Sequence, residues 1–404
     1  MASAVADTLE ALSETLAKAA EDLRSGSLSL ESDNLQRMGL LKAGGDLINA
    51  VSLPQDKIVL WLPHFAHMTA IRLFIKWKAF EKIPIDDGAT ISYTDLAATL
   101  GADVSLITRF ARVLVANGTL EQIGGDSVAH TKFSKVLTTA NPIWAMMQLG
   151  FDSQLSAWVA MPKYFDQYGI AAEPKDRLQT ILAFAEGSLG STVWDIHHSS
   201  EERLRVFMLA MGVIEEHMPA LGAYDLSWAV EEVGKSADRP LVVDVGGGRG
   251  HALKGIWKAT PGIPRNRCVL EDLPEVVEAA KREDPEMADV QTVPVDFFKE
   301  QPVKGALVYY IRRCLHDYSD DECVVMLKHL SGAMAPDSRL LIVETMLGDQ
   351  PSAFQAAMDL SMLTISGKER TRANFEDITG KAALKITKVS QIPGGSAVIE
   401  CALA

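Results

Sequence analysis

The ten residues from Leu241 to Gly250, Leu-Val-Val-Asp-Val-Gly-Gly-Gly-Arg-Gly, constrain the fold more than any other part of the chain. Four of the first five are apolar, which predicts a strand buried inside a parallel sheet. Glycines then occupy every second position, and a turn without Cβ atoms lets the backbone come close to a ligand. Leu253 and Ile256 follow at helical spacing, so the turn opens a helix. This order predicts a nucleotide-type site at the carboxyl end of a sheet.

The spacing of the glycines separates two kinds of ligand. The dinucleotide pattern G-x-G-x-x-G requires glycine at position 251, where this chain has His251. The pattern present, G-x-G-x-G, is similar to the first motif of class I methyltransferases, which bind S-adenosylmethionine. That ligand has no pyrophosphate to be held at a helix N-terminus. The glycines alone are also compatible with an ordinary strand–helix turn in another α/β protein.

Apolar segments alternate with helical patterns over residues 240–404, which predicts a doubly wound α/β fold around a seven-stranded, Rossmann-like parallel sheet. The last two segments are joined across Pro393-Gly394-Gly395 with no room for a helix, so they form an antiparallel hairpin. The expected strands are 241–245, 267–270, 290–295, 306–311, 339–344, 384–390 and 397–403.

Residues 1–140 are expected to form a helical and winged-helix domain. Amphipathic helices cover residues 1–80, and residues 91–139 show a short strand, two helices and a hairpin, with Thr94 and Ser105 as helix N-caps. A DNA-binding regulator would need a basic recognition helix, but Arg109 and Arg112 are the only basic residues on the second helix. The net charge of −14 also disfavours nucleic acid and anionic membranes as partners. We therefore expect a packing or dimerisation module.

Residues 141–225 are predicted to be helical and rich in methionine and aromatic side chains, which suit either a core or the wall of an apolar ligand pocket. The pair His197-His198 invites a metal, but a helix starting at Ser199 explains these residues more simply. The expected domains are thus 1–140, a pocket-forming segment 141–225 and a catalytic domain 226–404.

The four cysteines have no metal-binding spacing, and the N-terminal stretch lacks the apolar core of a signal peptide. The chain contains no run of 18 or more apolar residues, so no transmembrane helix is expected. These features favour reduced thiols and a cytoplasmic location.

Acidic residues follow two of the predicted strands. Asp272 lies after the second strand and can accept hydrogen bonds from ribose hydroxyls, although Glu271 beside it offers the same chemistry. Asp296 follows the third strand, and Phe297 next to it supplies a flat ring, a pair that suits an adenine.

His316 lies just beyond the fourth strand, where ligands bind in open α/β sheets, and its pKa suits a general base. The neighbouring residues from Ser319 to Glu322 form a capping box, whereas His316 has no such structural duty; a structural histidine remains the alternative. Glu344 ends the fifth strand, where its carboxylate can orient an imidazole. Glu369 alone reads as a surface charge in a polar turn.

Together these segments resemble the plant and fungal small-molecule O-methyltransferases of the caffeate and flavonoid type. The resemblance covers nearly the whole chain. The matching segments are 241–250, Asp-Leu-Pro at 272–274, Asp-Phe-Phe at 296–298, Arg-Arg-Cys-Leu-His-Asp-Tyr-Ser-Asp-Asp-Glu-Cys at 312–323 and Gly-Lys-Glu-Arg-Thr at 367–371.

The resemblance implies that His316 is the catalytic base, flanked by Glu344 and Glu369. No metal site is expected, because the sequence shows no metal-ligand pattern. It implies a small-molecule substrate and an intertwined homodimer built on the winged-helix part. The residues implied to contact S-adenosylmethionine are Gly246, Gly247, Asp272, Asp296, Phe297, Arg312 and, less directly, Arg313.

One edge departs from the family pattern. The family usually has Lys-Ala-Gly-Phe before the penultimate strand, whereas this chain has Lys-Ala-Ala-Leu at 381–384 and an unusual Gln-Ile-Pro at 391–393. Some relatives have lost methyl transfer and control pericyclic reactions instead. The main expectation is methylation of a phenolic or enolic, polyketide-type metabolite with His316 as base, and a pericyclase on the same fold is the alternative.

Overall fold

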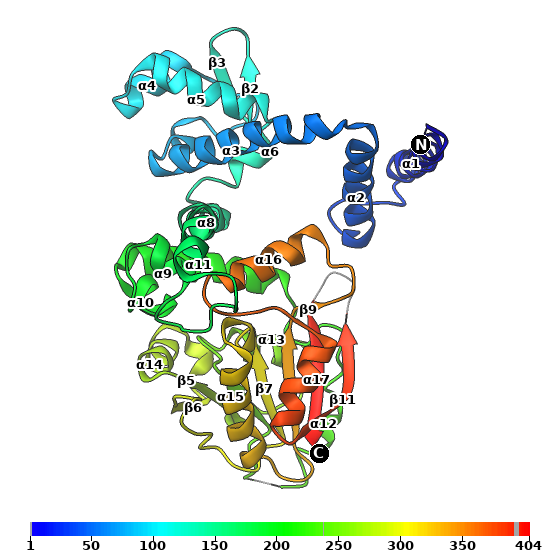
Figure 1. Cartoon of the computed structure of the whole chain (residues 1–404), viewed down its shortest axis with the longest axis vertical. Coiled ribbons are helices and arrows are strands. Elements are labelled where there is room, and N and C mark those ends of the chain that lie inside the picture. Colours follow the sequence, from blue (N-terminus) through cyan, green and yellow to red (C-terminus); the bar gives the residue numbers. More distant parts are fainter. Residues whose placement is uncertain (1, 237, 392–395) are drawn as a thin grey trace. The chain divides into compact units, whose positions relative to one another are not determined.

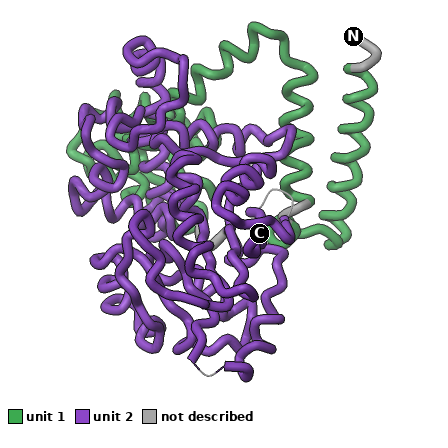
Figure 2. The backbone as a smooth tube through the Cα atoms, turned by 60° about the horizontal axis from the view of Figure 1, so that its bottom comes forward, with its two compact units in different colours: residues 1–135 green, residues 136–404 purple. Residues whose placement is uncertain are grey.

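The computed structural model describes residues 2–236, 238–391 and 396–404. The chain divides into two compact units, residues 1–135 and 136–404 (Figure 2). The first boundary lies five residues before the expected one at 140. Segment 141–225 belongs to the same compact unit as the sheet, so its separate role as a pocket-forming segment stays a prediction.

The first unit contains three long helices followed by short helices and a three-stranded sheet of order β1-β3-β2. The two short helices begin earlier than expected, so their N-caps are Ser92 and Asp103 rather than Thr94 and Ser105. The Ser92 Oγ accepts from the Asp95 N–H at 3.0 Å, and the Asp103 Oδ1 accepts from the Leu106 N–H at 2.9 Å. The elements are α1 (Ala2–Ser25), α2 (Asn34–Val51), α3 (Pro54–Lys76), a 3₁₀ turn (Phe80–Lys82), β1 (Ile91–Ser92), α4 (Tyr93–Leu100), α5 (Val104–Ala116), β2 (Leu120–Ile123), β3 (Ser127–His130) and α6 (Lys132–Lys135).

Helix α3 has one buried end and one exposed apolar stretch. Ala70 and Phe74 are fully buried, whereas Ile58 is 65% and Leu62 is 72% exposed. By length and composition this helix is apolar enough to cross a membrane, although the sequence shows no unbroken apolar run there. A single helix of this kind is weak evidence, because other apolar helices pass the same test. The expectation that the chain has no membrane partner stays a prediction.

The second unit opens with helices α7 to α11. Helix α10 ends at His198, and α11 begins at Glu201 with the Oγ of Ser200, not Ser199, accepting from the Arg203 N–H at 3.2 Å. The His197 ring is buried and stacks on Phe207 at 4.2 Å, which gives it a packing role. The elements are α7 (Ile143–Leu149), a π-helical turn (Gly150–Leu155), α8 (Ser156–Tyr168), α9 (Ile181–Ala185), α10 (Val193–His198), α11 (Glu201–His217) and α12 (Trp228–Glu231).

A seven-stranded sheet of order β11-β12-β8-β7-β4-β5-β6 forms the centre of this unit (Figure 1). Each predicted strand is present within two residues of its expected bounds, and β12 runs antiparallel to both neighbours as the hairpin required. The predicted turn at Pro393-Gly394-Gly395 lies outside the described residues. The strands are β4 (Val242–Val245), β5 (Cys268–Asp272), β6 (Gln291–Pro294), β7 (Val308–Arg312), β8 (Arg339–Glu344), β11 (Leu384–Gln391) and β12 (Ala397–Leu403).

Helices cover both faces of the sheet, which explains why its central strands are almost continuously apolar. Val243 and Tyr309 point to the face covered by α15 and α17, and Val242 and Val308 point to the face covered by α13 and α14. The helices are α13 (His251–Ala259), α14 (Pro274–Glu283), α15 (Asp320–Ala333), α16 (Ala353–Leu363) and α17 (Arg372–Lys381), with 3₁₀ turns at Arg265–Arg267, Pro285–Met287 and Leu315–Asp317.

A short parallel pair, β9 (Met346–Leu347) with β10 (Arg370–Thr371), was not predicted. Two residues per strand are too few to show a sequence period. The pair joins the end of β8 to the turn at 367–369, and so brings Glu344 and Glu369 to the same edge of the sheet.

The departure from the family pattern at 381–384 changes little in the backbone. Ala383 takes φ +56° after the end of α17, the left-handed conformation that glycine adopts freely. The chain therefore carries a strained alanine at a position whose backbone conformation favours glycine.

Candidate active site

The glycine turn after β4 makes a close backbone cradle at the carboxyl edge of the sheet. Gly246 and Gly248 take φ +66° and +57°, so both require the left-handed region. A Cβ at Gly247 would overlap the Asp244 side chain and Leu270. The turn is held by the Gly247 N–H, which donates to the Glu271 carbonyl at 3.0 Å.

Asp272, not Glu271, is the acid that faces this cradle. Its Oδ2 accepts from the Gly248 N–H at 2.8 Å and its Oδ1 from the Leu273 N–H at 2.7 Å, leaving each oxygen with a further lone pair. Burial raises its pKa, and these two N–H groups oppose that shift. The Glu271 carboxylate points elsewhere and accepts from the Gln301 amide at 2.6 Å. The structure thus separates two acids that the sequence left equivalent.

Phe297 lies against the same cradle. Its ring comes within 3.5 Å of the position that a Cβ on Gly246 would take. Phe297, Phe298 and Tyr318 pack edge to face, and the Arg177 guanidinium covers Phe298 at 4.6 Å. Asp296 precedes this cluster; burial works to raise its pKa, but Lys299, which lies 3.0 Å away, and other donors hold the pKa below its usual value.

Arg312 and Arg313 end the central strand β7, at the level of Gly246. Arg312 Nη2 donates to the Met218 carbonyl at 2.7 Å, and its buried Nε has no hydrogen-bond partner in the described chain. Arg313 takes φ +48°, a strained conformation for a non-glycine residue, and its charge acts on the pKa of Asp317.

His316 sits in a single 3₁₀ turn, Leu315–Asp317, directly after β7. The turn borders the cradle, because the Cys314 Sγ lies 3.4 Å from the Cβ position of Gly246. His316 Nδ1 pairs with the Glu369 Oε1 at 3.0 Å. Its other ring nitrogen, Nε2, has Asp317 at 3.5 Å, beyond a good hydrogen bond, and so remains available to a reacting group.

The Glu344 carboxylate contacts both the backbone of this turn and the imidazole of His316. Its Oε1 accepts from the N–H groups of Cys314 and Leu315, both at 2.9 Å. Its Oε2 is buried without a hydrogen-bond partner and lies 3.7 Å from His316 Nδ1. Ligand atoms of His316, Glu344 and Glu369 lie within 4.8 Å of one another, close enough for one cation to touch all three.

The charges of neighbouring carboxylates determine the pKa of His316. Burial works to lower its pKa, but the carboxylates of Glu344, Asp317 and Glu369 outweigh burial and raise the pKa to about 9. Burial also raises the pKa of Glu344 and of Asp317. The imidazole is therefore largely cationic at neutral pH.

The local sequence pattern missed several residues around His316. Glu369, which only the resemblance named, is 4% exposed rather than a surface charge, and Asp317 lies beside the imidazole. Arg370 is 1% exposed and binds the turn around His316. No local signal marks these residues, because turn residues and charges are usually solvated.

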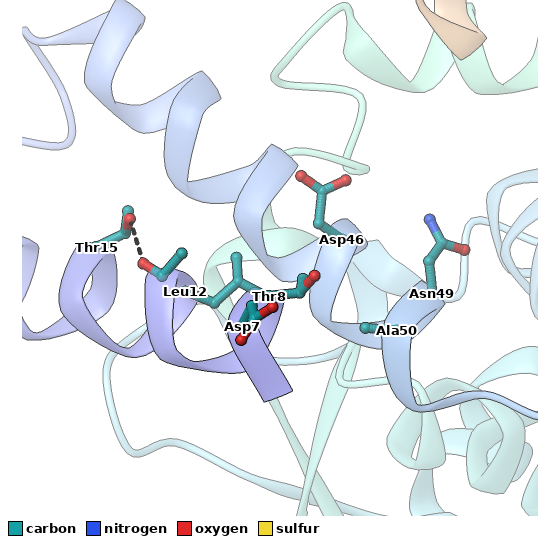
Figure 3. A pocket seen from close by; sticks show the side chains of 8 residues that line it. Asp7, Thr8, Leu12, Thr15, Asp46, Asn49 and Ala50 are labelled. Atoms are coloured by element: carbon teal, nitrogen blue, oxygen red, sulfur yellow. Dashed lines mark hydrogen bonds between the residues drawn. The ribbon is translucent and has the colours of Figure 1, made fainter. Parts of the chain in front are cut away.

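A surface hollow lies between two helices of the first unit. Asp7 and Thr8 of α1 and Asp46 and Asn49 of α2 line it (Figure 3). Asp46 is already paired with Lys42 at 2.6 Å. No residue predicted for catalysis or cofactor binding belongs to this hollow.

Comparisons with known proteins identify the family of this chain. Residues 174–385 match the family model of the O-methyltransferase domain. The methyltransferase cfoD of Aspergillus candidus is 38% identical over 369 residues, covering 89% of this chain and 90% of the relative.

Solved structures share the fold. OxaC in complex with SAH and oxaline superposes with a TM-score of 0.84 at 21% identity, covering 98% of this chain and 100% of that one. A structure described as "A Pericyclic Reaction enzyme" gives 0.78 at 21% identity, covering 96% of this chain and 99% of that one. The chain belongs to the O-methyltransferase family, whose members take their methyl group from S-adenosylmethionine.

Proposed function

We propose that this protein uses S-adenosylmethionine to methylate a phenolic or enolic hydroxyl of a small, polyketide-type metabolite, with His316 as general base. The observation that carries the proposal is the buried His316, which is held through Nδ1 by Glu369 while Nε2 stays available beside the glycine cradle. A base must lie within hydrogen-bond reach of the proton that it removes, and a fixed Nδ1 partner sets the tautomer.

The cradle fits the cofactor residue by residue. The left-handed glycines present backbone without side chains at this edge, Asp272 offers two carboxylate lone pairs for ribose hydroxyls, and Phe297, which lies against Gly246, offers a ring for adenine. Arg312 adds a buried donor at the same level. When bound, the cofactor supplies an electrophilic methyl group. The chain's own residues hold the hydroxyl and take its proton at His316 Nε2, and orienting two reactants in this way contributes effective molarities of about 10⁵ M or more.

The test separates binding from chemistry with two variants. His316→Ala should keep S-adenosylmethionine affinity by calorimetry but lose roughly 10²- to 10⁴-fold in rate, the usual contribution of a positioned base. Asp272→Ala should weaken that affinity. The assay quantifies S-adenosylhomocysteine formed with candidate phenolic or polyketide substrates. Saturable NAD binding without S-adenosylmethionine binding would reject the cofactor assignment.

A pericyclase is the second candidate, and the raised pKa of His316 favours it. A cationic imidazole donates a hydrogen bond and stabilises developing negative charge without removing a proton. The structure described as a pericyclic reaction enzyme has the same fold. An isomerised substrate of unchanged mass, with no S-adenosylhomocysteine, would select this function over methylation.

We also propose that the partner is a second copy of the chain rather than nucleic acid or membrane. The net charge of −14 repels polyanions. The exposed apolar side chains of α3 favour burial against another protein surface. A cytoplasmic location fits the four buried free cysteines.

A further inference from the structure

Arg370 is a fully buried cation on β10, next to the Glu369 that holds the imidazole. Its Nε pairs with the Asp320 Oδ1 at 2.8 Å. Its Nη1 donates to the Leu315 carbonyl and its Nη2 to the Tyr318 carbonyl, each at 2.8 Å. The guanidinium therefore donates hydrogen bonds to backbone carbonyls on both sides of His316, at Leu315 and at Tyr318.

The segment that carries Arg370 touches the base turn at every residue. The Lys368 N–H donates to the His316 carbonyl at 2.7 Å. Gly367 packs so closely that a Cβ there would overlap the same carbonyl oxygen. The segment is anchored in turn by the Glu369 N–H, which donates to the Asp359 Oδ1 on α16 at 3.0 Å.

Burial of a guanidinium is expensive unless its donors are all used, and breaking such a buried pair is strongly destabilising. Arg372, two residues along the chain, shows the ordinary alternative: it is exposed and pairs with Glu376 at 2.9 Å. Two of the three short contacts of Arg370 hold the backbone carbonyls of Leu315 and Tyr318 around His316, and the third holds Asp320 at the start of α15.

We propose that Arg370 is a positioning residue for the base: it locks the 315–318 turn so that His316 Nδ1 stays on Glu369 and Nε2 keeps its direction toward the reacting group. This inference deepens the proposed function and rests on it for the role of His316. A misplacement of about 1 Å at a reacting group can cost about 10²-fold in rate, so a lock of this kind matters to the chemistry.

The lead variant is Arg370→Lys, because it keeps the charge but not the planar fork that reaches two carbonyls and a carboxylate together. Arg372→Lys is the matched control. We expect Arg370→Lys to lose about 10- to 100-fold in kcat, with S-adenosylmethionine affinity unchanged and KM changed little. The control should match the wild type.

A second readout needs no substrate. The imidazole titration of His316 is followed by NMR with ¹³C-labelled histidine and identified by its absence in His316→Ala. In Arg370→Lys the pKa should fall from about 9 toward 6.5, because a loosened ring moves away from Glu344, Glu369 and Asp317, while Asp359, Arg313 and the charge at 370 remain. A failed methylation assay with this shift present would refute the proposed function and leave the positioning role standing.

If Arg370→Lys does not fold, Asp320, the partly buried carboxylate that pairs with the Arg370 guanidinium, is changed instead. Asp320→Asn removes the carboxylate that holds Nε, and Asp321→Asn, at the next position of α15, is its control. We expect a smaller loss of kcat, about threefold to tenfold, only in Asp320→Asn. Wild-type kcat and an unchanged His316 titration in a folded Arg370→Lys or Asp320→Asn protein would overturn the inference.

Discussion

His316 shares its buried pocket with the carboxylates of Glu344, Glu369 and Asp317, whose distances from the ring nitrogens run from 3.0 to 3.7 Å. Such a ring holds its proton more tightly than free histidine, so a proton leaves it only at high pH. Methylation needs a neutral His316 as base, whereas the pericyclase hypothesis uses the cationic imidazole. The two candidate functions therefore predict opposite pH dependences.

For methylation we expect kcat/KM to rise with pH through an apparent pKa near 9, because only neutral His316 accepts the proton. Glu369→Gln removes a carboxylate that favours the cation, so the apparent pKa should fall. Glu376→Gln, on an exposed glutamate of α17, is the control. Initial rates from pH 6 to 10 measure the profile. Activity that instead declines through pH 9 would show that the cationic form is the working one.

Glu271 gives a prediction for stability rather than activity. It is fully buried, and burial raises its pKa from 4.5 to about 7. A raised folded-state pKa contributes stability that is complete below about pH 4.5 and is lost as the pH rises through 7. The difference in pKa corresponds to about 3 kcal/mol, as an order of magnitude.

Glu271→Gln stays neutral and still accepts from Gln301. We expect its free energy of unfolding in urea to exceed that of the wild type at pH 8 by on the order of 1–3 kcal/mol. The two proteins should come together below about pH 4.5, since the side chain at position 271 is then neutral in both the folded and the unfolded state of each protein. Equal differences at the two pH values would contradict this account.

Among the secondary-structure elements, the junction between α17 and β11 holds an alanine in the left-handed backbone conformation that glycine usually adopts. Ala383 follows the C-cap Ala382 with φ +56°, and its N–H donates to the Gly380 carbonyl at 3.2 Å. Holding an L-residue in the left-handed conformation costs roughly 1–2 kcal/mol. Glycine avoids this cost, but its greater conformational entropy in the unfolded state offsets part of the gain in stability.

Ala383→Gly should therefore raise the free energy of unfolding by about 0.5–1 kcal/mol, measured by urea denaturation. The same substitution inside α16, Ala356→Gly, is the control and should lower it by about 1 kcal/mol. Activity should be unchanged in Ala383→Gly. A destabilised Ala383→Gly protein would show that the alanine side chain contributes packing that outweighs its strain.

In the molecule as a whole, the first unit carries large apolar side chains that are exposed to solvent. Along α2 and α3, Leu41 is 60%, Ile58 is 65%, Val59 is 68% and Leu62 is 72% exposed. Because exposed apolar surface is a common feature of protein interfaces, the proposed homodimer predicts that a second copy of the chain covers these side chains.

We expect light scattering at micromolar concentration to give twice the chain mass of 43.9 kDa. Leu62→Glu places a charge in the exposed stretch of α3 and should shift the equilibrium to monomer. Val325→Glu, on α15 of the other unit and 42% exposed, is the control and should remain dimeric. A monomeric wild-type protein with intact N-terminal helices would reject the dimer.

The strands of the sheet and the glycine turn at its edge could be predicted from the sequence. Buried parallel strands must be apolar on both faces, and left-handed turns favour glycine, so β4, β7 and the turn at 246–250 carry local signals. His316 and Glu344 could be placed because the end of a strand fixes where its next residues lie. The resemblance to O-methyltransferases added Glu369, which local pattern alone gave as a surface charge.

The arrangement and the charge of the site depend on contacts between segments that lie far apart in the sequence. Glu369 and Arg370 reach the turn of His316 across more than fifty positions of sequence, through a two-residue strand pair that leaves no periodic signal. Which of two neighbouring acids faces the glycine turn depended on the direction of β5, and the helix N-caps depended on hydrogen-bond geometry. The charge on His316 depends on burial and on three carboxylates that converge in space, because desolvation and Coulomb energy follow distance and not sequence separation.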